Sequence, residues 1–116
     1  MSAGPLFEIR DYNYRPERID DYRAWARGAV PVLAELLDLV GFWIDAGIEA
    51  RVAGSDPMTP RHGHPKTTWV IRWQDMEERE ARWEALWEEP SWQDQWSRHP
   101  GFDDYLHMAV RFLHAA

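Results

Sequence analysis

The sequence predicts an α+β fold, in which one antiparallel sheet of four strands carries its helices on a single face. Four segments alternate their side chains with a period of two, as strands do, and two segments between them repeat apolar residues at helical spacing. The chain has 116 residues, 45% of them hydrophobic and 28% charged, which suffices for one core. We therefore expect a single domain over residues 1–116.

The first strand is predicted at about Leu6 to Tyr14, and Arg15-Pro16 ends it because proline cannot donate to a strand ladder. Phe7 and Ile9 are expected on one face of this strand. The opposite face would hold Glu8, Arg10, Tyr12 and Tyr14. A strand with one apolar face and one charged, aromatic face is half-buried, and its second face borders either water or a polar pocket. We predict the pocket.

One helix, bent at Pro31, is predicted from Pro16 to about Leu37. A second strand follows at Leu39 to Asp45. The Gly- and Pro-rich stretch after it indicates a long loop, although a strand through Ile48–Val52 would make a long hairpin instead. Loops of this length are usually functional or mobile.

The third strand is predicted at Thr67 to Gln74, and Asp75 with Glu78 forms a capping-box pattern that begins a helix. A short helix should begin at Ser91, and the last strand should span about Tyr105 to His114. The order strand, helix, strand, strand, helix, strand is the ferredoxin-like βαββαβ arrangement, whose right-handed crossovers place both helices on one face.

The face without helices is predicted to be apolar and to need a cover. Its large side chains would be Tyr12, Trp43, Trp69, Ile71 and Trp73. Such a surface exceeds the few hundred Å² of contiguous apolar patch that a monomer normally exposes. We therefore expect a homodimer in which two sheets pack face to face and enclose the sites.

Several motifs resemble the NIPSNAP family over nearly the whole chain. They are residues 8–12 (EIRDY), 39–43 (LVGFW), 69–79 (WVIRWQDMEER) and 89–93 (EPSWQ). The resemblance implies membership of the dimeric α/β-barrel superfamily, which includes monooxygenases, isomerases, lyases, haem enzymes and binding proteins. The family commonly has a histidine where Trp69 stands, so no role of that histidine is transferred to this chain. Membership of such a superfamily does not settle function.

The candidate site is predicted on the face of the sheet that carries Glu8. Its catalytic candidates are Glu8, Arg10, Tyr12, Asp45 and His107, and its substrate-binding candidates are Trp43, Trp69, Trp73 and Arg111. An arginine would bind a carboxylate, enolate or other oxyanion, and a carboxylate or His107 would move a proton. The alternative is that these residues form salt bridges and an aromatic dimer interface.

His62 and His64 form a second candidate cluster in the long loop. Two histidines one residue apart can share a metal, but this spacing by itself is a weak signal. We predict instead a lid over the mouth of the barrel, with substrate contacts from His62 or His64, and no metal site. Trp83, Trp87, Trp92 and Trp96 are interpreted as packing residues, and residues 77–80 as a solvated helix face.

Composition narrows the classes of function. The net charge of −7 and the single lysine, Lys66, argue against sequence-independent binding to nucleic acid. The absence of cysteine excludes disulfides and thiolate catalysis, and no segment has the apolar length of a membrane span or the shape of a signal peptide. The simple expectation is a cytoplasmic protein without a phosphate-binding glycine motif.

These observations favour a small cofactor-independent enzyme that acts on an aromatic or polycyclic carbonyl compound by acid–base chemistry, as a lyase, cyclase, isomerase or monooxygenase. Its pocket would lie either between the sheet and the helices or between two sheets. One alternative is a non-catalytic protein that binds a small ligand or haem, with His107 or a loop histidine as the axial ligand. Another is a dimer that binds a protein partner and has a filled barrel without a pocket.

Overall fold

The computed structural model describes residues 4–116 as a four-stranded antiparallel sheet with helices packed on it. The elements are β1 (Leu6–Tyr14), a 3-10 turn η1 (Pro16–Arg18), α1 (Ile19–Leu36), β2 (Leu39–Ile44), β3 (Thr67–Trp73), α2 (Met76–Leu86), α3 (Pro90–Ser97), η2 (Phe102–Asp104) and β4 (Tyr105–His114). The strand order is β2-β3-β1-β4, and every pairing is antiparallel. The predicted α+β, ferredoxin-like fold is therefore confirmed.

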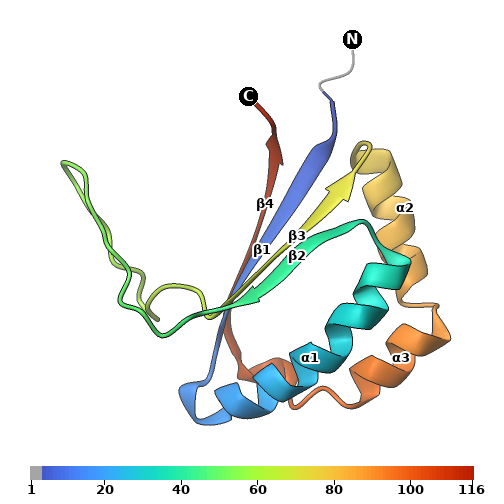
Figure 1. Ribbon diagram of the computed structural model, residues 1–116, viewed down its shortest axis with the longest axis horizontal. Coiled ribbons are helices and arrows are strands. Elements are labelled where there is room, and N and C mark those ends of the chain that lie inside the picture. Colours follow the sequence, from blue (N-terminus) through green and yellow to red (C-terminus); the bar gives the residue numbers. More distant parts are fainter. Residues whose placement is uncertain (1–3) are drawn as a thin grey trace.

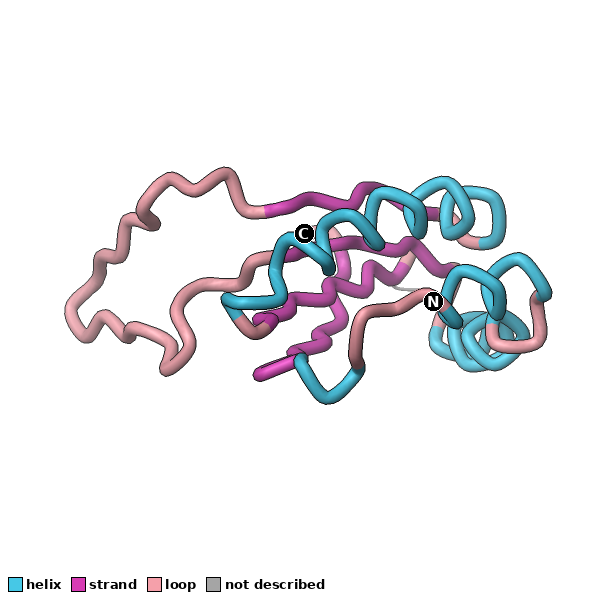
Figure 2. The backbone as a smooth tube through the Cα atoms, turned by 90° about the horizontal axis from the view of Figure 1, so that it is seen from below, coloured by secondary structure: helices cyan, strands magenta, loops and turns pink. Residues whose placement is uncertain are grey.

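The three helices lie on the same side of the sheet, and its opposite face carries no helix (Figures 1 and 2). The core forms where α1, α2 and α3 meet the sheet. Its largest fully buried side chains include Trp73, Tyr22 and Leu33. The helices pack on one face because the two right-handed crossovers, β1–α1–β2 and β3–α2–α3–β4, run on the same side.

Local sequence signals explain most of the element ends. Asp75 caps α2, since its Oδ1 accepts a hydrogen bond from the backbone N–H of Glu78 at 2.8 Å. Glu78 in turn accepts one from the N–H of Gln74. Pro31 lies inside α1, and the helix nevertheless continues to Leu36. The residues before Ile19 form the separate turn η1 and are not part of α1 as we predicted.

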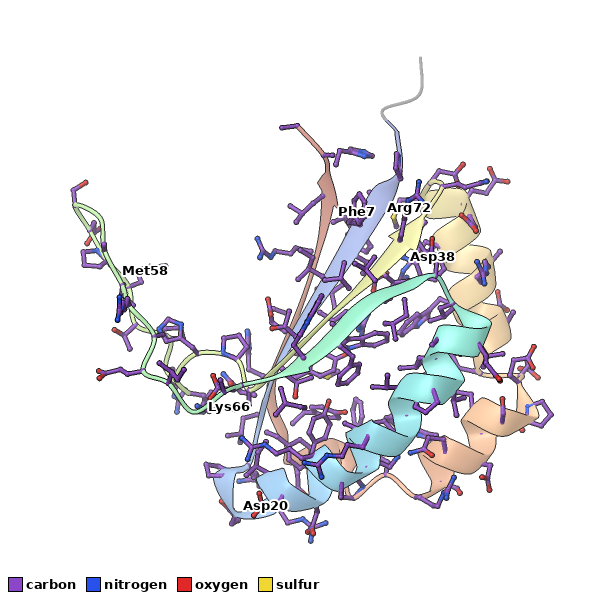
Figure 3. The ribbon with its side chains drawn as sticks, viewed as in Figure 1. Phe7, Asp20, Asp38, Met58, Lys66 and Arg72 are labelled. Carbon is purple, nitrogen blue, oxygen red and sulfur yellow. The ribbon has the colours of Figure 1, made fainter. Side chains whose placement is uncertain are left out.

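Two further boundaries differ from the sequence predictions. Residues 48–52 form no strand, so the connection between β2 and β3 is a loop and not a long hairpin. This loop, residues 45–66, projects away from the helices, and Figure 3 labels Met58 on it and Lys66 at its base. Helix α3 begins at Pro90, one residue before the predicted start, because proline suits the first turn of a helix.

The predicted assignment of the two sheet faces is wrong for most of its aromatic residues. The buried side chains of β1 and β3 that lie under the helices are Glu8, Arg10, Tyr12, Trp69, Ile71 and Trp73. Because side chains alternate along a strand, Phe7 and Ile9 lie on the uncovered face. Phe7 pairs with Arg72 of β3, and both are labelled in Figure 3.

The uncovered face mixes apolar and charged side chains. Trp43 and Leu113 are exposed on it, Phe7, Ile9 and Val70 are partly buried, and Asp11 and Arg111 lie among them. The ring of Trp43 lies across Gly41, where an added Cβ would come within 2.2 Å of the indole. Among residues 4–116, no helix combines the length and the apolar character that crossing a membrane requires.

Candidate functional site between the sheet and the helices

Glu8 stands at the centre of a buried ionic cluster that joins the sheet to α2. Its side chain is fully buried, and its Oε2 lies 2.6 Å from Nη1 of Arg10. Arg79 of α2 contacts both carboxylate oxygens, with Nε 2.8 Å from Oε1 and Nη2 3.2 Å from Oε2. The indole N–H of Trp73 donates a fourth hydrogen bond to Oε1, at 3.1 Å. The carboxylate is therefore saturated by donors.

These contacts determine the charge of Glu8. Burial alone would raise the pKa of this carboxyl group, but the hydrogen bonds and positive charges of Arg79 and Arg10 together outweigh burial and lower the pKa below 4.5. Glu8 is ionised at neutral pH and has no free lone pair directed at a ligand. Its function here is to hold Arg10 and Arg79, so the predicted role as a proton carrier does not fit its surroundings.

Arg10 is held in place by aromatic rings as well as by Glu8. Its guanidinium carbon lies 4.5 Å from the ring centroid of Trp83 and 5.6 Å from that of Trp69. Its Nε donates to the hydroxyl of Tyr12 at 2.5 Å. Within the described part of the chain, its Nη2 forms no hydrogen bond, and Arg10 lines an internal cavity. One edge of the cation is thus available to a bound molecule.

The cavity lies between the sheet and the three helices and has a volume of about 110 Å³. Its walls are mostly indole rings, from Trp25, Trp69, Trp83, Trp87, Trp92 and Trp96. Phe102 and Trp87 also line it and are exposed, so the mouth opens beside them. Because engineered apolar cavities of about 150 Å³ bind benzene, the space fits one small ring better than a polycycle.

Tyr12 adds a proton donor next to Arg10. Burial raises the pKa of its hydroxyl above 10.0, and the charge and hydrogen bond of Arg10 only partly offset this. The hydroxyl therefore stays protonated at neutral pH. Because its oxygen accepts from Arg10, its own proton can point toward the cavity. Arg10 and Tyr12 together form an oxyanion subsite on β1.

A chain of hydrogen bonds runs from Gly101 through His99 to Tyr105, and Tyr105 lines the cavity. The backbone N–H of Gly101 donates to Nδ1 of His99 at 3.0 Å, and Nε2 of His99 lies 2.8 Å from the hydroxyl of Tyr105. Burial lowers the pKa of His99 to about 4, and the nearby charge of Asp104 opposes this shift only weakly. The imidazole is therefore neutral at pH 7.

Three buried donors on the cavity wall have no hydrogen-bond partner among residues 4–116. They are the hydroxyl of Tyr22 and the indole N–H groups of Trp69 and Trp92. Native proteins leave few such groups unsatisfied, because each costs about 1–3 kcal/mol when buried without a partner. The cavity therefore offers donors to a ligand that carries acceptors.

The structure separates the predicted site residues into three places. Arg10, Tyr12 and Trp69 line the cavity, and Glu8 and Trp73 lie behind it in the ionic cluster. Trp43, His107 and Arg111 belong to the uncovered face, because they alternate with cavity-facing residues on β2 and β4. We grouped these three with Glu8, and that grouping was wrong.

The remaining candidates lie in or beside the long loop. Asp45 accepts a hydrogen bond from the N–H of Gly47 and borders a groove that also contains His62. Neither residue lines the cavity, and the loop projects away from the helices, so the predicted lid over its mouth is not seen (Figures 1 and 2). His64 is also outside the cavity, and the described residues contain no cluster suited to a metal ion.

Sequence reasoning missed Arg79, His99 and Tyr105. Arg79 was interpreted as part of a solvated face, yet it lies three residues after Met76 and four before Trp83, within the apolar stripe of α2. A charged residue inside such a stripe is a usable signal of a buried ion pair. His99 gave no comparable signal, since its partners come from the turn at Gly101 and from β4.

Comparison with known proteins bears on the fold. No protein-family model and no curated protein matches this sequence. Among solved structures, a NIPSNAP family protein from Agrobacterium tumefaciens superposes with a TM-score of 0.72 at 17% identity, over 97% of this chain and 87% of that one. This chain has the fold of NIPSNAP proteins. The resemblance noted in the sequence is thus confirmed at the level of the fold.

Two further neighbours show how widely this fold is used. A NIPSNAP domain protein from Burkholderia xenovorans superposes with a TM-score of 0.66 at 19% identity, over 96% of this chain and 94% of that one. A protein described as a putative antibiotic biosynthesis monooxygenase, from Bordetella bronchiseptica, superposes with a TM-score of 0.59 at 13% identity over 97% and 98%. At sequence identities this low, the comparison shows a shared fold only. The function of this NIPSNAP-like chain must therefore be argued from the residues of its own site.

Proposed function

We propose that this protein binds a small aromatic or enolisable carbonyl compound in the cavity and holds a negatively charged oxygen of that compound between Arg10 and Tyr12. The main support for this proposal is that Arg10, whose Nη2 forms no hydrogen bond with a described residue, lies beside the protonated hydroxyl of Tyr12 at a cavity lined mostly by aromatic side chains. Donors preorganised in a site of low polarity stabilise developing negative charge far better than water does.

The balance of charge supports an anionic ligand. One buried carboxylate, Glu8, faces two guanidinium groups. Arg79 has a second partner in the exposed Glu80, 3.1 Å away, whereas the free edge of Arg10 is directed at the cavity. A carboxylate, phenolate or enolate at this edge would complete the pairing of Arg10.

The reaction class that fits this arrangement is enolisation of a carbonyl substrate, as in an isomerase, cyclase, lyase or cofactor-independent monooxygenase. The substrate proton would pass to water, because none of the described residues that line the cavity is a free base. Arg10 and Tyr12 would lower the energy of the oxyanion, and the indole walls would stack on the planar substrate. Two of the solved neighbours, from Bordetella bronchiseptica and Bacteroides, are described as putative antibiotic biosynthesis monooxygenases, which is in keeping with a small-molecule substrate.

A non-catalytic binding protein is the second candidate. It is favoured by the lack of a free carboxylate among the described residues that line the cavity. A haem-binding version does not fit these residues, because the cavity is small and no described histidine lines it. His99, which packs against the lining residues Trp96 and Tyr105, has both ring nitrogens in hydrogen bonds.

Binding and turnover can be tested separately. Benzoate titrated into the protein should quench tryptophan fluorescence, and Tyr12→Phe should weaken binding about 3–10-fold through loss of one hydrogen bond. Arg10→Gln should weaken it further, whereas Arg111→Gln on the uncovered face is the matched control. Benzoate binding that is unchanged in both cavity variants would overturn the proposal. Acceleration of phenylpyruvate tautomerisation, lost in Tyr12→Phe, separates the enzyme from the binding protein.

We also propose that the uncovered sheet face packs against a second copy of this chain. Trp43 and Leu113 are exposed there, and one structural neighbour, from Jannaschia, is described as a dimeric ferredoxin-like protein. The cavity is enclosed within one protomer, so the dimer would not form its walls. Sedimentation should give a dimer for the wild type and a monomer for Val70→Lys, with Asp94→Lys on α3 as the control. A monomeric wild-type protein contradicts this proposal.

A further inference from the structure

We infer that the ligand carries a second oxygen, a neutral hydrogen-bond acceptor, which binds the hydroxyl of Tyr22 where α1 lines the cavity. His99 and Tyr105 are positioning residues for this contact. The inference rests on the proposed function, since it concerns the other end of the same ligand. The chemical class is then an aryl acid or aryl enolate with an ether, carbonyl or hydroxyl oxygen across the ring.

The hydrogen bond from the Gly101 N–H determines the direction of the hydrogen bonds that follow it. A backbone N–H can only donate, so Nδ1 of His99 must be its acceptor and carries no proton. In a neutral imidazole the single proton is then on Nε2, which donates to the oxygen of Tyr105 at 2.8 Å. The lowered pKa of His99 maintains this tautomer at pH 7. The carbonyl of Gly101 is fixed as well, because the Tyr14 hydroxyl donates to it at 2.6 Å.

The next member of the chain is Tyr105. Because its oxygen accepts from His99, its own proton is directed elsewhere, and the hydroxyl adjoins that of Tyr22. Burial raises the pKa of both phenols, so both remain protonated and both remain donors. The ring centroids of Tyr22 and Tyr105 are 5.8 Å apart, and the rings pack edge to face.

Tyr22 follows Tyr105 as the last residue of this series of polar contacts, and its hydroxyl proton has no acceptor among residues 4–116. The residue is only 1% exposed, lines the cavity, and its hydroxyl makes no hydrogen bond of normal geometry with any described residue. The hydroxyl groups of Thr67 and Tyr105 lie near enough to lower the pKa of Tyr22 slightly, but the distances and angles do not make a hydrogen bond with either, and the Thr67 hydroxyl is itself without a partner among residues 4–116. A hydroxyl this deeply buried, at the wall of a cavity, needs an acceptor from a bound molecule.

The strand register gives the spacing of the two subsites. Trp69, the partner of Arg10 in β3, and Thr67, which adjoins Tyr22, are two residues apart on the same strand. Two residues along a strand correspond to roughly 7 Å. A benzene ring with an oxygen-bearing group at each end is about as long, and the indole rings between the subsites would pack on its faces.

Benzoate and two substituted benzoates test this inference. Unsubstituted benzoate, 4-methylbenzoate and 4-methoxybenzoate share the carboxylate, and only the last offers an acceptor at the far end. We expect 4-methoxybenzoate to bind about 3–10-fold more tightly than 4-methylbenzoate, as one neutral hydrogen bond would give. Calorimetric titration measures both dissociation constants in the same protein.

Substitutions at Tyr22, His99 and Tyr105 test whether these residues cause the preference for 4-methoxybenzoate over 4-methylbenzoate. Tyr22→Phe should reduce the methoxy-to-methyl ratio to about one. His99→Leu, which lacks both hydrogen bonds, and Tyr105→Phe should reduce the ratio while benzoate affinity stays the same, and His99→Gln, which keeps a donor and an acceptor, should retain it. A purely structural role of His99 would alter all three affinities together and leave the ratio unchanged. His107→Gln, exposed on β4, is the control. Urea unfolding of each variant confirms that the comparison is made between folded proteins.

The outcomes separate this inference from the proposed function. If none of the benzoates binds, or if binding does not depend on Arg10, the proposed function fails and this inference fails with it. If benzoate binds in an Arg10-dependent manner but the wild type shows no preference for the methoxy group, only the inference is overturned. A preference that survives Tyr22→Phe overturns the assignment to Tyr22 in the same way.

Discussion

The carboxylate of Glu8 on β1 and the guanidinium of Arg79 on α2 form a two-point salt bridge across the interface between sheet and helix, at 2.8 and 3.2 Å. Glu8 also holds Arg10, so a single buried anion fixes two cations from different elements. This relationship positions the free edge of Arg10 at the cavity. Stability and binding should therefore respond together when Glu8 is changed.

Removing the negative charge of Glu8 should strongly lower the free energy of unfolding. Glu8→Gln keeps the shape but leaves two guanidinium groups without their buried counter-charge, at a cost of about 3–5 kcal/mol in the free energy of unfolding. Urea denaturation followed by tryptophan fluorescence measures the change. The control is Asp94→Asn, which removes an exposed pair with Arg98 on α3 and should cost less than about 0.5 kcal/mol. Equal effects of the two substitutions would contradict the role of Glu8.

Acid should destabilise the fold through His99. The pKa of His99 in the folded protein is about 4, below its ordinary value of 6.5, because burial disfavours the imidazolium. The unfolded chain therefore takes up the proton first, and stability falls as the pH drops from 6.5 to about 4. The loss attributable to this half-buried ring is about 2–3 kcal/mol.

The measurement is the free energy of unfolding at several pH values in that window. His99→Gln preserves a donor toward Tyr105 and an acceptor toward Gly101 but cannot titrate, so its stability should fall less steeply with acid. Glu8, whose pKa is lowered, adds its own loss only as the pH falls below 4.5. Parallel pH profiles for the wild type and His99→Gln would show that this histidine is not the titrating group.

The tyrosines should resist ionisation until the protein unfolds. All four, Tyr12, Tyr14, Tyr22 and Tyr105, have a raised pKa, chiefly because burial disfavours the phenolate, and that of Tyr14 is about 12. Unfolded tyrosines ionise near pH 10, so stability is lost as the pH rises above 10. Phenolate absorbance should appear together with the loss of circular dichroism. Phenolate that forms at pH 10 in a protein with intact secondary structure would refute this expectation.

Asp75 should contribute measurably as the N-cap of α2. Asp75→Ala removes the hydrogen bond from the Glu78 N–H and should lower the free energy of unfolding by about 0.5–2 kcal/mol. Glu89 occupies the N-cap position of α3 without any side-chain capping bond, so Glu89→Ala is the matched control with little expected effect. Thermal unfolding of the two variants distinguishes capping from a general effect of removing an acidic residue. A similar loss in both would argue against the cap.

The sequence predicted the elements well because the signals that determine them are local. The alternation in residues 6–14 and 105–114 gave β1 and β4 with the ends that the structure shows, and Asp75 with Glu78 marked the start of α2. Proline restricts its own backbone, so Pro16 indicated where β1 ends. From the order of these elements the ferredoxin-like topology followed, since handedness and short connections leave few alternatives.

The sequence alone determined which residues of each strand share a face, because that depends only on the period of two in an extended chain. Which of the two faces the helices cover was decided by tertiary structure. Glu8 and Arg10 made their face look solvent-exposed or lining a pocket between sheets, and burial there became favourable only because α2 delivers Arg79 to the same carboxylate. No local pattern encodes a neutralising partner that lies 71 residues away in the chain.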